Sequence, residues 1–162
     1  MKTISRRSLL LQLAGTRAQL EQYEQAATAC RECIEVTTRV LGPEAGMLAD
    51  ANWTLANALE NLDKGREATR HFEIACGILE QSTNGGRKPA LGYVNLRLAS
   101  RYLVEGHLAK AEKHARTSFE IHKKLYKLDH SATRRSAKVL AEICAKADRP
   151  EEAARWRKLG TR

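Results

Sequence analysis

The stretch VLGPEAGMLADANWTLANALENL, from Val40 to Leu62, decides the fold. Gly42 and Pro43 interrupt one helical pattern, and an alanine- and leucine-rich pattern begins directly after them. Both residue types are common at helix ends, because proline cannot continue a helix and glycine tolerates left-handed backbone. The architecture depends on whether this turn is a single link between two helices or one copy of a repeat.

The turn belongs to a repeat with a period of 42 or 43 residues. An alanine near the start of a helical segment recurs at intervals of 42, 43 and 42 residues, at Ala26, Ala68, Ala111 and Ala153. A second set of alanines, each preceded by leucine, lies 12 residues before these, at Ala14, Ala56, Ala99 and Ala141. The turns also align, since Glu44 in the first pairs with Asp129 in a later one. Two sets of small residues with one period over four copies indicate a repeat protein.

Each unit contains two helical segments. In the second unit, leucines and alanines recur at three- and four-residue steps, which predicts a helix, at Leu48, Ala51, Leu55, Leu59 and Leu62. Small residues let two antiparallel helices approach closely, and one such pair cannot bury its apolar stripe alone, so successive pairs must stack. The sequence therefore predicts an all-α fold with helices over 5–20 and 23–40, 46–62 and 66–82, 89–105 and 108–127, and 131–147 and 150–159.

We expect residues 1–162 to form a single repeat domain. Its units cover approximately 5–42, 46–84, 88–127 and 131–160. The last helix is short and ends at Thr161-Arg162, which is typical of a cap or of the edge of a module in a longer protein.

These patterns resemble the tetratricopeptide repeat (TPR) family, and the 42-residue period and the linkers resemble its kinesin-light-chain type. Leu41–Glu44 matches the family linker in one turn, and Asp129, His130 and Thr133 match it in another. The resemblance implies a right-handed α-solenoid of about four helix pairs. It also implies a non-enzymatic scaffold or adaptor that binds peptides or partner proteins in its concave groove.

The resemblance implies that the first helix of each unit lines this groove. The family's paired asparagines before the Leu-Ala step are replaced by Trp53-Thr54 and by Leu96-Arg97, so the groove has side chains of its own. We expect an apolar anchor from Trp53, Tyr93 and Leu96, a hydrogen bond from Asn57 to a peptide backbone, and binding of acidic side chains by Arg97, Arg135 and Lys138. Arginine suits this role because its planar fork can hold both oxygens of a carboxylate. The alternative for Trp53 and Tyr93 is packing between adjacent units.

The charge is spread unevenly along the chain. Residues 1–86 carry 9 Lys and Arg against 11 Asp and Glu, whereas residues 87–162 carry 19 against 8. This asymmetry predicts a partly acidic partner for the second half, and the alternative is a solvated, lysine-rich surface. A nucleic acid is a further alternative, since a basic stripe could follow phosphates along Lys110, Lys113, Arg116, Lys123, Lys124 and Lys127. Glu112 and Glu120 interrupt that stripe, which argues against a continuous track for phosphates.

The sequence carries no recognisable catalytic or metal-binding motif. Cys30 and Cys33 share a helix face without a second pair to complete a zinc site, so we expect buried free thiols. The five histidines are scattered, and neither a nucleophile motif nor a phosphate-binding glycine loop occurs. We therefore expect no enzymatic activity, no metal and no cofactor.

The same sequence predicts a cytoplasmic protein. The four cysteines show no disulfide framework, which suits a reducing compartment. Ser5-Arg6-Arg7 resembles an export signal, but the apolar run that follows is short and leads directly into a polar helix. No apolar run approaches the roughly 20 residues of a membrane span. Besides groove binding, the sequence leaves open a spacer role and self-association into homo-oligomers through the terminal helices.

Overall fold

The computed structural model describes residues 5–41, 46–82 and 87–161. Within these residues it contains eight α-helices and no strand. The helices are α1 (Arg6–Gln19), α2 (Tyr23–Leu41), α3 (Gly46–Asn61), α4 (Gly65–Gln81), α5 (Lys88–Val104), α6 (Leu108–Tyr126), α7 (Ser131–Lys146) and α8 (Pro150–Gly160). Every helix expected from the sequence is present, and both ends of each lie within one residue of the prediction. The predicted Gly42-Pro43 turn lies outside the described residues.

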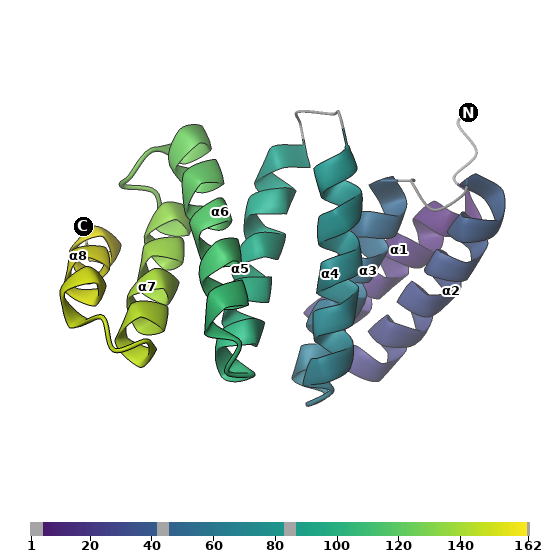
Figure 1. Cartoon of the computed structure of the whole chain (residues 1–162). Helices are drawn as coiled ribbons and strands as arrows, with labels where there is room; N and C mark the ends of the chain where they lie inside the picture. Colours follow the sequence, from purple (N-terminus) through teal and green to yellow (C-terminus); the bar gives the residue numbers. More distant parts are fainter. Residues whose placement is uncertain (1–4, 42–45, 83–86, 162) are drawn as a thin grey trace. The chain divides into compact units, whose positions relative to one another are not determined.

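The helices form antiparallel pairs, α1 with α2, α3 with α4, α5 with α6 and α7 with α8 (Figure 1). The chain divides into two compact units, Met1–Ser82 and Thr83–Arg162, and each unit holds two of these pairs. Within the first unit α2 packs on α3 and α1 lies against α3; within the second, α6 packs on α7 and α5 lies against α7. The all-α arrangement of stacked helix pairs is therefore confirmed.

The alanines that define the period occupy equivalent buried places. Each of the four alanines in the second helices is the fourth residue of its helix and is fully buried, at Ala26, Ala68, Ala111 and Ala153. The four alanines of the first helices are also buried, at Ala14, Ala56, Ala99 and Ala141. A methyl group at these places lets the paired helices approach closely, which a larger side chain would prevent.

The turn inside each helix pair has the same backbone geometry in all four pairs. One residue adopts positive φ, and the positions recur with the period of the repeat: Glu21 at 58°, Asp63 at 57°, Gly106 at 79° and Asp148 at 56°. The amide of the next residue donates to a carbonyl five residues earlier, as from Lys64 to Leu59 at 2.9 Å. This hydrogen bond and the left-handed residue are the signature of a Schellman helix end. Identical turns therefore set the direction of the second helix in every pair.

The linker between α6 and α7 has a strained residue. Lys127 lies at φ 66° and ψ −178°, a combination that is essentially restricted to glycine. Its carbonyl accepts a hydrogen bond from the Thr133 hydroxyl at 2.7 Å. In the repeat alignment Lys127 corresponds to Gly42 of the earlier linker, so a lysine stands where that linker has a glycine.

Candidate functional site

The residues predicted to line the groove lie on first helices of their pairs. In the first unit, Trp53 and Asn57 lie on α3. In the second unit, Tyr93, Leu96 and Arg97 lie on α5, and Arg135 and Lys138 lie on α7. Because α5 and α7 contact each other, the structure brings the five residues of the second unit onto one pair of neighbouring helices.

In the first unit, Trp53 takes part in packing within its own helix pair. Its ring meets that of Phe72 on α4 edge to face, with centroids 5.7 Å apart and an angle of 70°. Trp53 is half-buried and Phe72 is fully buried, so part of the indole remains accessible. Asn57 donates from Nδ2 to the Trp53 carbonyl at 2.9 Å, which leaves its Oδ1 as the acceptor for another donor.

On α5, the apolar side chains are largely committed to packing. Tyr93 is half-buried, and its ring lies 4.7 Å from that of His122 on α6. Leu96 is only 9% exposed, so its side chain offers little area to a ligand. Arg97 is exposed; desolvation lowers the pKa of its guanidinium, and the charge of Arg101 lowers it further. An arginine remains charged at neutral pH after such a change.

On α7, Arg135 and Lys138 are exposed cations. Within the described residues neither forms an ion pair or a side-chain hydrogen bond. The stem of Lys138 lies against α8, because a Cβ added at Gly160 would come within 2.8 Å of Lys138 Cγ. Packing therefore restrains this stem, which lowers the entropy lost when the ammonium group binds an anion.

The basic stripe suggested for α6 is interrupted by ion pairs. Arg116 pairs with Glu112 at 2.6 Å and with Glu152 of α8 at 2.6 Å. Arg149 pairs with the same two carboxylates, Glu112 and Glu152. The pKa of the Glu112 carboxyl lies below its usual value, chiefly because Arg149 and then Arg116 hydrogen-bond to it. Arg116 is thus committed to neighbouring carboxylates, and the stripe is not a continuous row of uncompensated cations.

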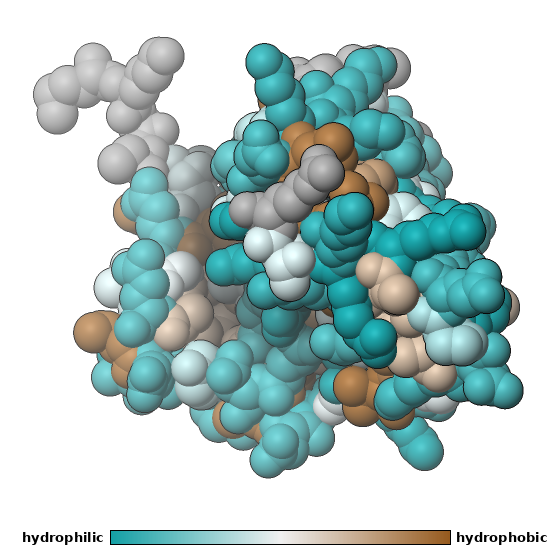
Figure 2. All heavy atoms as spheres, turned by 90° about the vertical axis from the view of Figure 1, so that its left-hand side faces the viewer, coloured by the Kyte–Doolittle hydropathy of each residue, from teal (hydrophilic) through white to brown (hydrophobic). Residues whose placement is uncertain are grey.

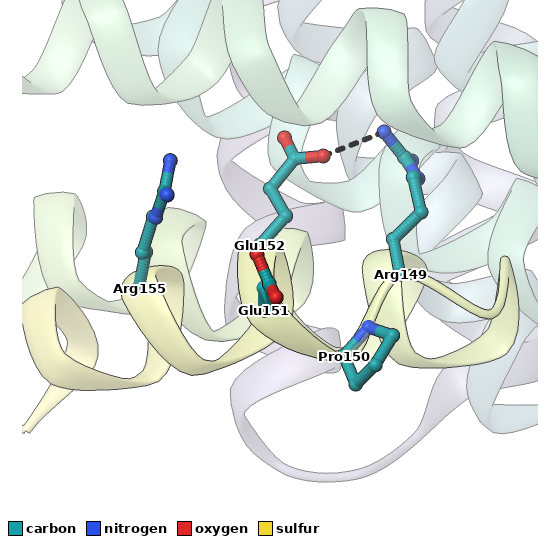
Figure 3. Close-up of a pocket in the computed structure, with 5 residues that line it drawn as sticks. All are labelled: Arg149, Pro150, Glu151, Glu152 and Arg155. Carbon is teal, nitrogen blue, oxygen red and sulfur yellow. Dashed lines mark hydrogen bonds and ion pairs between the residues drawn. The ribbon is translucent and has the colours of Figure 1, made fainter.

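A hollow of about 480 Å³ lies at the start of α8 (Figure 3). Arg149, Pro150, Glu151, Glu152 and Arg155 line it. Arg149 and Glu152 pair with each other across it at 2.8 Å, as the dashed line in Figure 3 shows. Since two of its charged side chains already neutralise each other, the hollow offers less to a charged ligand than α5 and α7 do.

Polar pairs between a buried asparagine and a half-buried histidine, which the sequence reasoning missed, connect the helices of two hairpins. His71 Nδ1 lies 2.8 Å from Asn52 Oδ1, and His114 Nδ1 lies 2.8 Å from Asn95 Oδ1. Each asparagine donates from Nδ2 to the carbonyl four residues before it, which fixes its amide orientation. Both residues of the pair recur after 43 residues, so an alignment of the second and third units contained the signal.

The cysteines are free and buried, as expected. Desolvation raises the pKa of the Cys30 thiol to about 12, and it also raises the pKa of Cys33. Their thiolates, which would be the reactive forms, are therefore disfavoured. In the part of the chain that the structure describes, no group of three or more His, Cys, Asp or Glu is arranged to hold a metal ion. No helix of that part is both long and apolar enough to cross a bilayer.

Comparisons with known proteins identify the repeat and the fold. The sequence model of the tetratricopeptide repeat matches residues 7–44, which cover α1, α2 and the start of the following linker. The structure is similar to BtubC (BKLC) from P. vanneervenii, with a TM-score of 0.86 and 14% identity, over 99% of this chain and 65% of that chain. It is also similar to a putative kinesin light chain with TPR-like repeats from Podosopora anserina, with a TM-score of 0.79 and 20% identity, over 96% of this chain and 74% of that chain.

A third solved structure with this fold is the apo form of RapI, with a TM-score of 0.83 and 14% identity, over 99% of this chain and 56% of that chain. At these identities the likeness shows the fold. No curated protein matches the sequence. The chain spans about 65% of the length of BtubC, so the activity of the whole relative does not transfer.

Proposed function

We propose that this chain, whose first helix pair matches the tetratricopeptide repeat and whose fold is that of kinesin-light-chain-like TPR structures, is a non-catalytic adaptor that binds an acidic peptide. The observation that carries the proposal is the pair of uncompensated cations on α7, Arg135 and Lys138, next to Arg97 on the contacting helix α5. A cytoplasmic location accompanies the proposal, because all four cysteines are free thiols.

The proposed surface combines charge with limited apolar contact. Arg97 and Arg135 hold carboxylates through their planar forks, while Lys138 acts as a point charge on a restrained stem. The accessible edge of Tyr93 packs against the peptide between these charges. In the first unit, Asn57 Oδ1 accepts a hydrogen bond from a peptide amide, in keeping with its free acceptor position. In that unit Trp53 offers the accessible part of its indole, and in the second unit Leu96 contributes the small accessible part of its side chain.

The test is binding of a fluorescent, Glu- and Asp-rich peptide library to the chain, followed by titration of the best binder. The variant Arg135→Glu/Lys138→Glu is expected to weaken binding by more than tenfold, which is about 1.4 kcal/mol or more. The matched control is Lys113→Glu/Lys124→Glu, which makes the same change of charge at exposed positions on α6. If the control weakens binding equally, the interaction depends on net charge and the assignment to α7 is wrong.

Self-association is a second candidate function, and exposed leucines on α1 favour it. Leu9 is 51% exposed, Leu13 is 45% exposed and Leu20, directly after the helix, is 60% exposed. By contrast, the side of the molecule seen in Figure 2 is covered mostly by hydrophilic side chains, and on α8 Arg155, Arg157 and Lys158 are exposed. An exposed apolar helix face is suited to contact with another helix.

Sedimentation velocity across a hundredfold range of concentration tests this candidate. Self-association through α1 predicts a dimer that Leu9→Gln/Leu13→Gln converts to a monomer. A wild-type chain that remains monomeric throughout would rule out this candidate.

A further inference from the structure

The second unit contains a buried histidine with an unusual environment. His122 on α6 is fully buried. Its Nδ1 lies 3.2 Å from Ser136 Oγ on α7 and 3.4 Å from Ser118 Oγ, and the two hydroxyl groups lie 2.8 Å apart. Its Nε2 is buried without a hydrogen-bond partner. A Cβ added at Gly92 of α5 would lie 2.6 Å from that nitrogen, so α5 closes over the ring.

This hydrogen-bond pattern favours one neutral form of the imidazole. The Ser136 hydroxyl donates to the Ala132 carbonyl at 3.1 Å, which leaves its oxygen to accept from His122 Nδ1–H. The unpartnered Nε2 then carries a lone pair and no hydrogen. An unpaired acceptor of this kind costs less free energy in the interior than an unpaired N–H donor. Protonation would place a second N–H and a full positive charge on this buried ring, and Nε2 has no hydrogen-bond acceptor among the described residues.

A second histidine nearby acts as a hydrogen-bond acceptor at a helix end. His130 lies at the N-cap of α7, where its Nδ1 accepts a hydrogen bond from the Ala132 amide at 3.2 Å. Protonation converts that acceptor into a donor and places a positive charge at the positive end of the helix dipole. Both changes destabilise the first turn of α7.

Aromatic contacts connect these two histidines into a row of four rings. The centroids are 4.7 Å apart from Tyr93 to His122, 6.0 Å from His122 to Tyr126 and 4.3 Å from Tyr126 to His130. The row leads from α5 through α6 to the start of α7, and it passes the strained residue Lys127. Because strain of this kind costs on the order of 1–3 kcal/mol, a local opening that relaxes Lys127 recovers part of its cost.

We propose that the Tyr93–His122–Tyr126–His130 row is a proton-operated latch, which holds the start of α7 against α5 and α6 while both imidazoles are neutral and releases it when they are protonated. Each imidazole takes up one proton from solvent when the latch opens. The latch operates without a ligand, so it stands independently of the peptide-binding proposal. Its opening displaces the helix that carries Arg135, so binding at α7 becomes dependent on pH.

The groups that face the latch come from α5, α6, α7 and the linker before α7. Against His122, α5 presents Tyr93, α6 presents Tyr126 and the linker presents His130, while α7 presents the Ser136 hydroxyl and the Ala132 backbone. Desolvation is the largest cause and lowers the pKa of His122, a hydrogen bond with the Ala132 backbone raises it, and the charge of His130 lowers it, so that the net shift is downward. Around His130 the nearest charged residue in sequence is Asp129, which is exposed and solvated.

The test is amide hydrogen exchange of residues 131–135 at pH 7.5 and 5.0, corrected for the intrinsic pH dependence of exchange. The experiment uses the full chain without peptide. We expect the protection factors of the wild type to fall at the lower pH. The expected fall is about tenfold for each unit by which the pKa of a latch histidine is lower in the closed state than in the open state. His130→Ser keeps an N-cap acceptor that does not titrate. This variant should therefore lose less protection than the wild type between pH 7.5 and pH 5.0. His122→Phe/His130→Ser should remove the pH dependence, and the matched control His107→Asn should behave as the wild type.

Imidazole NMR of the wild type supplies a readout that does not depend on a folded His122 variant. At pH 7.5, His122 should be in the Nδ1–H form, and its protonation should coincide with the loss of protection at residues 131–135. The proposal is overturned if His122 is protonated without that loss, if wild-type protection does not change with pH, or if His130→Ser leaves the response unaltered.

Discussion

Replacement of Lys127 by glycine should stabilise the protein. At φ 66° and ψ −178°, a residue with a Cβ is strained by on the order of 1–3 kcal/mol, and glycine is not. Glycine also increases the conformational entropy of the unfolded chain, which costs about 0.4–1 kcal/mol. The expected net gain is therefore about 1 kcal/mol, which corresponds to a melting temperature about 2–4 °C higher for a chain of this size. The earlier linker already has Gly42 at the corresponding position.

The matched control is Lys127→Ala, because it removes the same charge and aliphatic stem but keeps the Cβ. Calorimetry and urea unfolding of the two variants compare them directly. We expect Lys127→Gly to be more stable than Lys127→Ala by about 1 kcal/mol or more. Equal stability of the two variants would show that the backbone at this linker is not strained, and the contribution of Lys127 to the latch would be refuted with it.

Three further predictions concern the buried contacts. Gly92→Ala should destabilise the chain by about 1–3 kcal/mol in urea unfolding, because the new methyl group overlaps His122. The control Gly77→Ala on α4, where nothing lies within 4 Å of the new methyl group, should instead stabilise the chain by up to about 1 kcal/mol. A similar effect of both substitutions would contradict the packing around Gly92. Asn95→Ala should cost about 1–3 kcal/mol by the same assay, because the half-buried His114 on α6 loses the Asn95 Oδ1 acceptor, and a neutral effect would argue against the pair. Stability should also fall as the pH drops from about 7.5 to 5.5, because desolvation lowers the pKa of His71 and of His122 in the folded state. The unfolded chain, whose imidazoles titrate near 6.5, therefore binds protons at a higher pH than the folded chain does. Unfolding curves that coincide at the two pH values would contradict this.

The residues predicted for the groove show what a repeat pattern assigns and what it leaves open. Register placed Trp53, Leu96 and Lys138 at one equivalent position on first helices, and they do lie there. The structure adds that this position contacts the partner helix, since Trp53 meets Phe72 and the stem of Lys138 lies against Gly160. The period of a pattern fixes which face of a helix a residue occupies, but the neighbour it touches depends on how closely the two helices approach.

The sequence by itself determined the helices, their ends and their pairing. These depend on local chemistry that repeats along the chain: small residues at fixed intervals, apolar residues at helical steps, and turns that end one helix before the next begins. Only the tertiary structure decided which polar groups are buried together, such as His122 with Ser136, and which cations pair with a carboxylate on another helix, such as Arg116 with Glu152. Those partners lie 14 to 36 residues apart on different helices, and no local pattern reports how two side chains meet after the helices have packed.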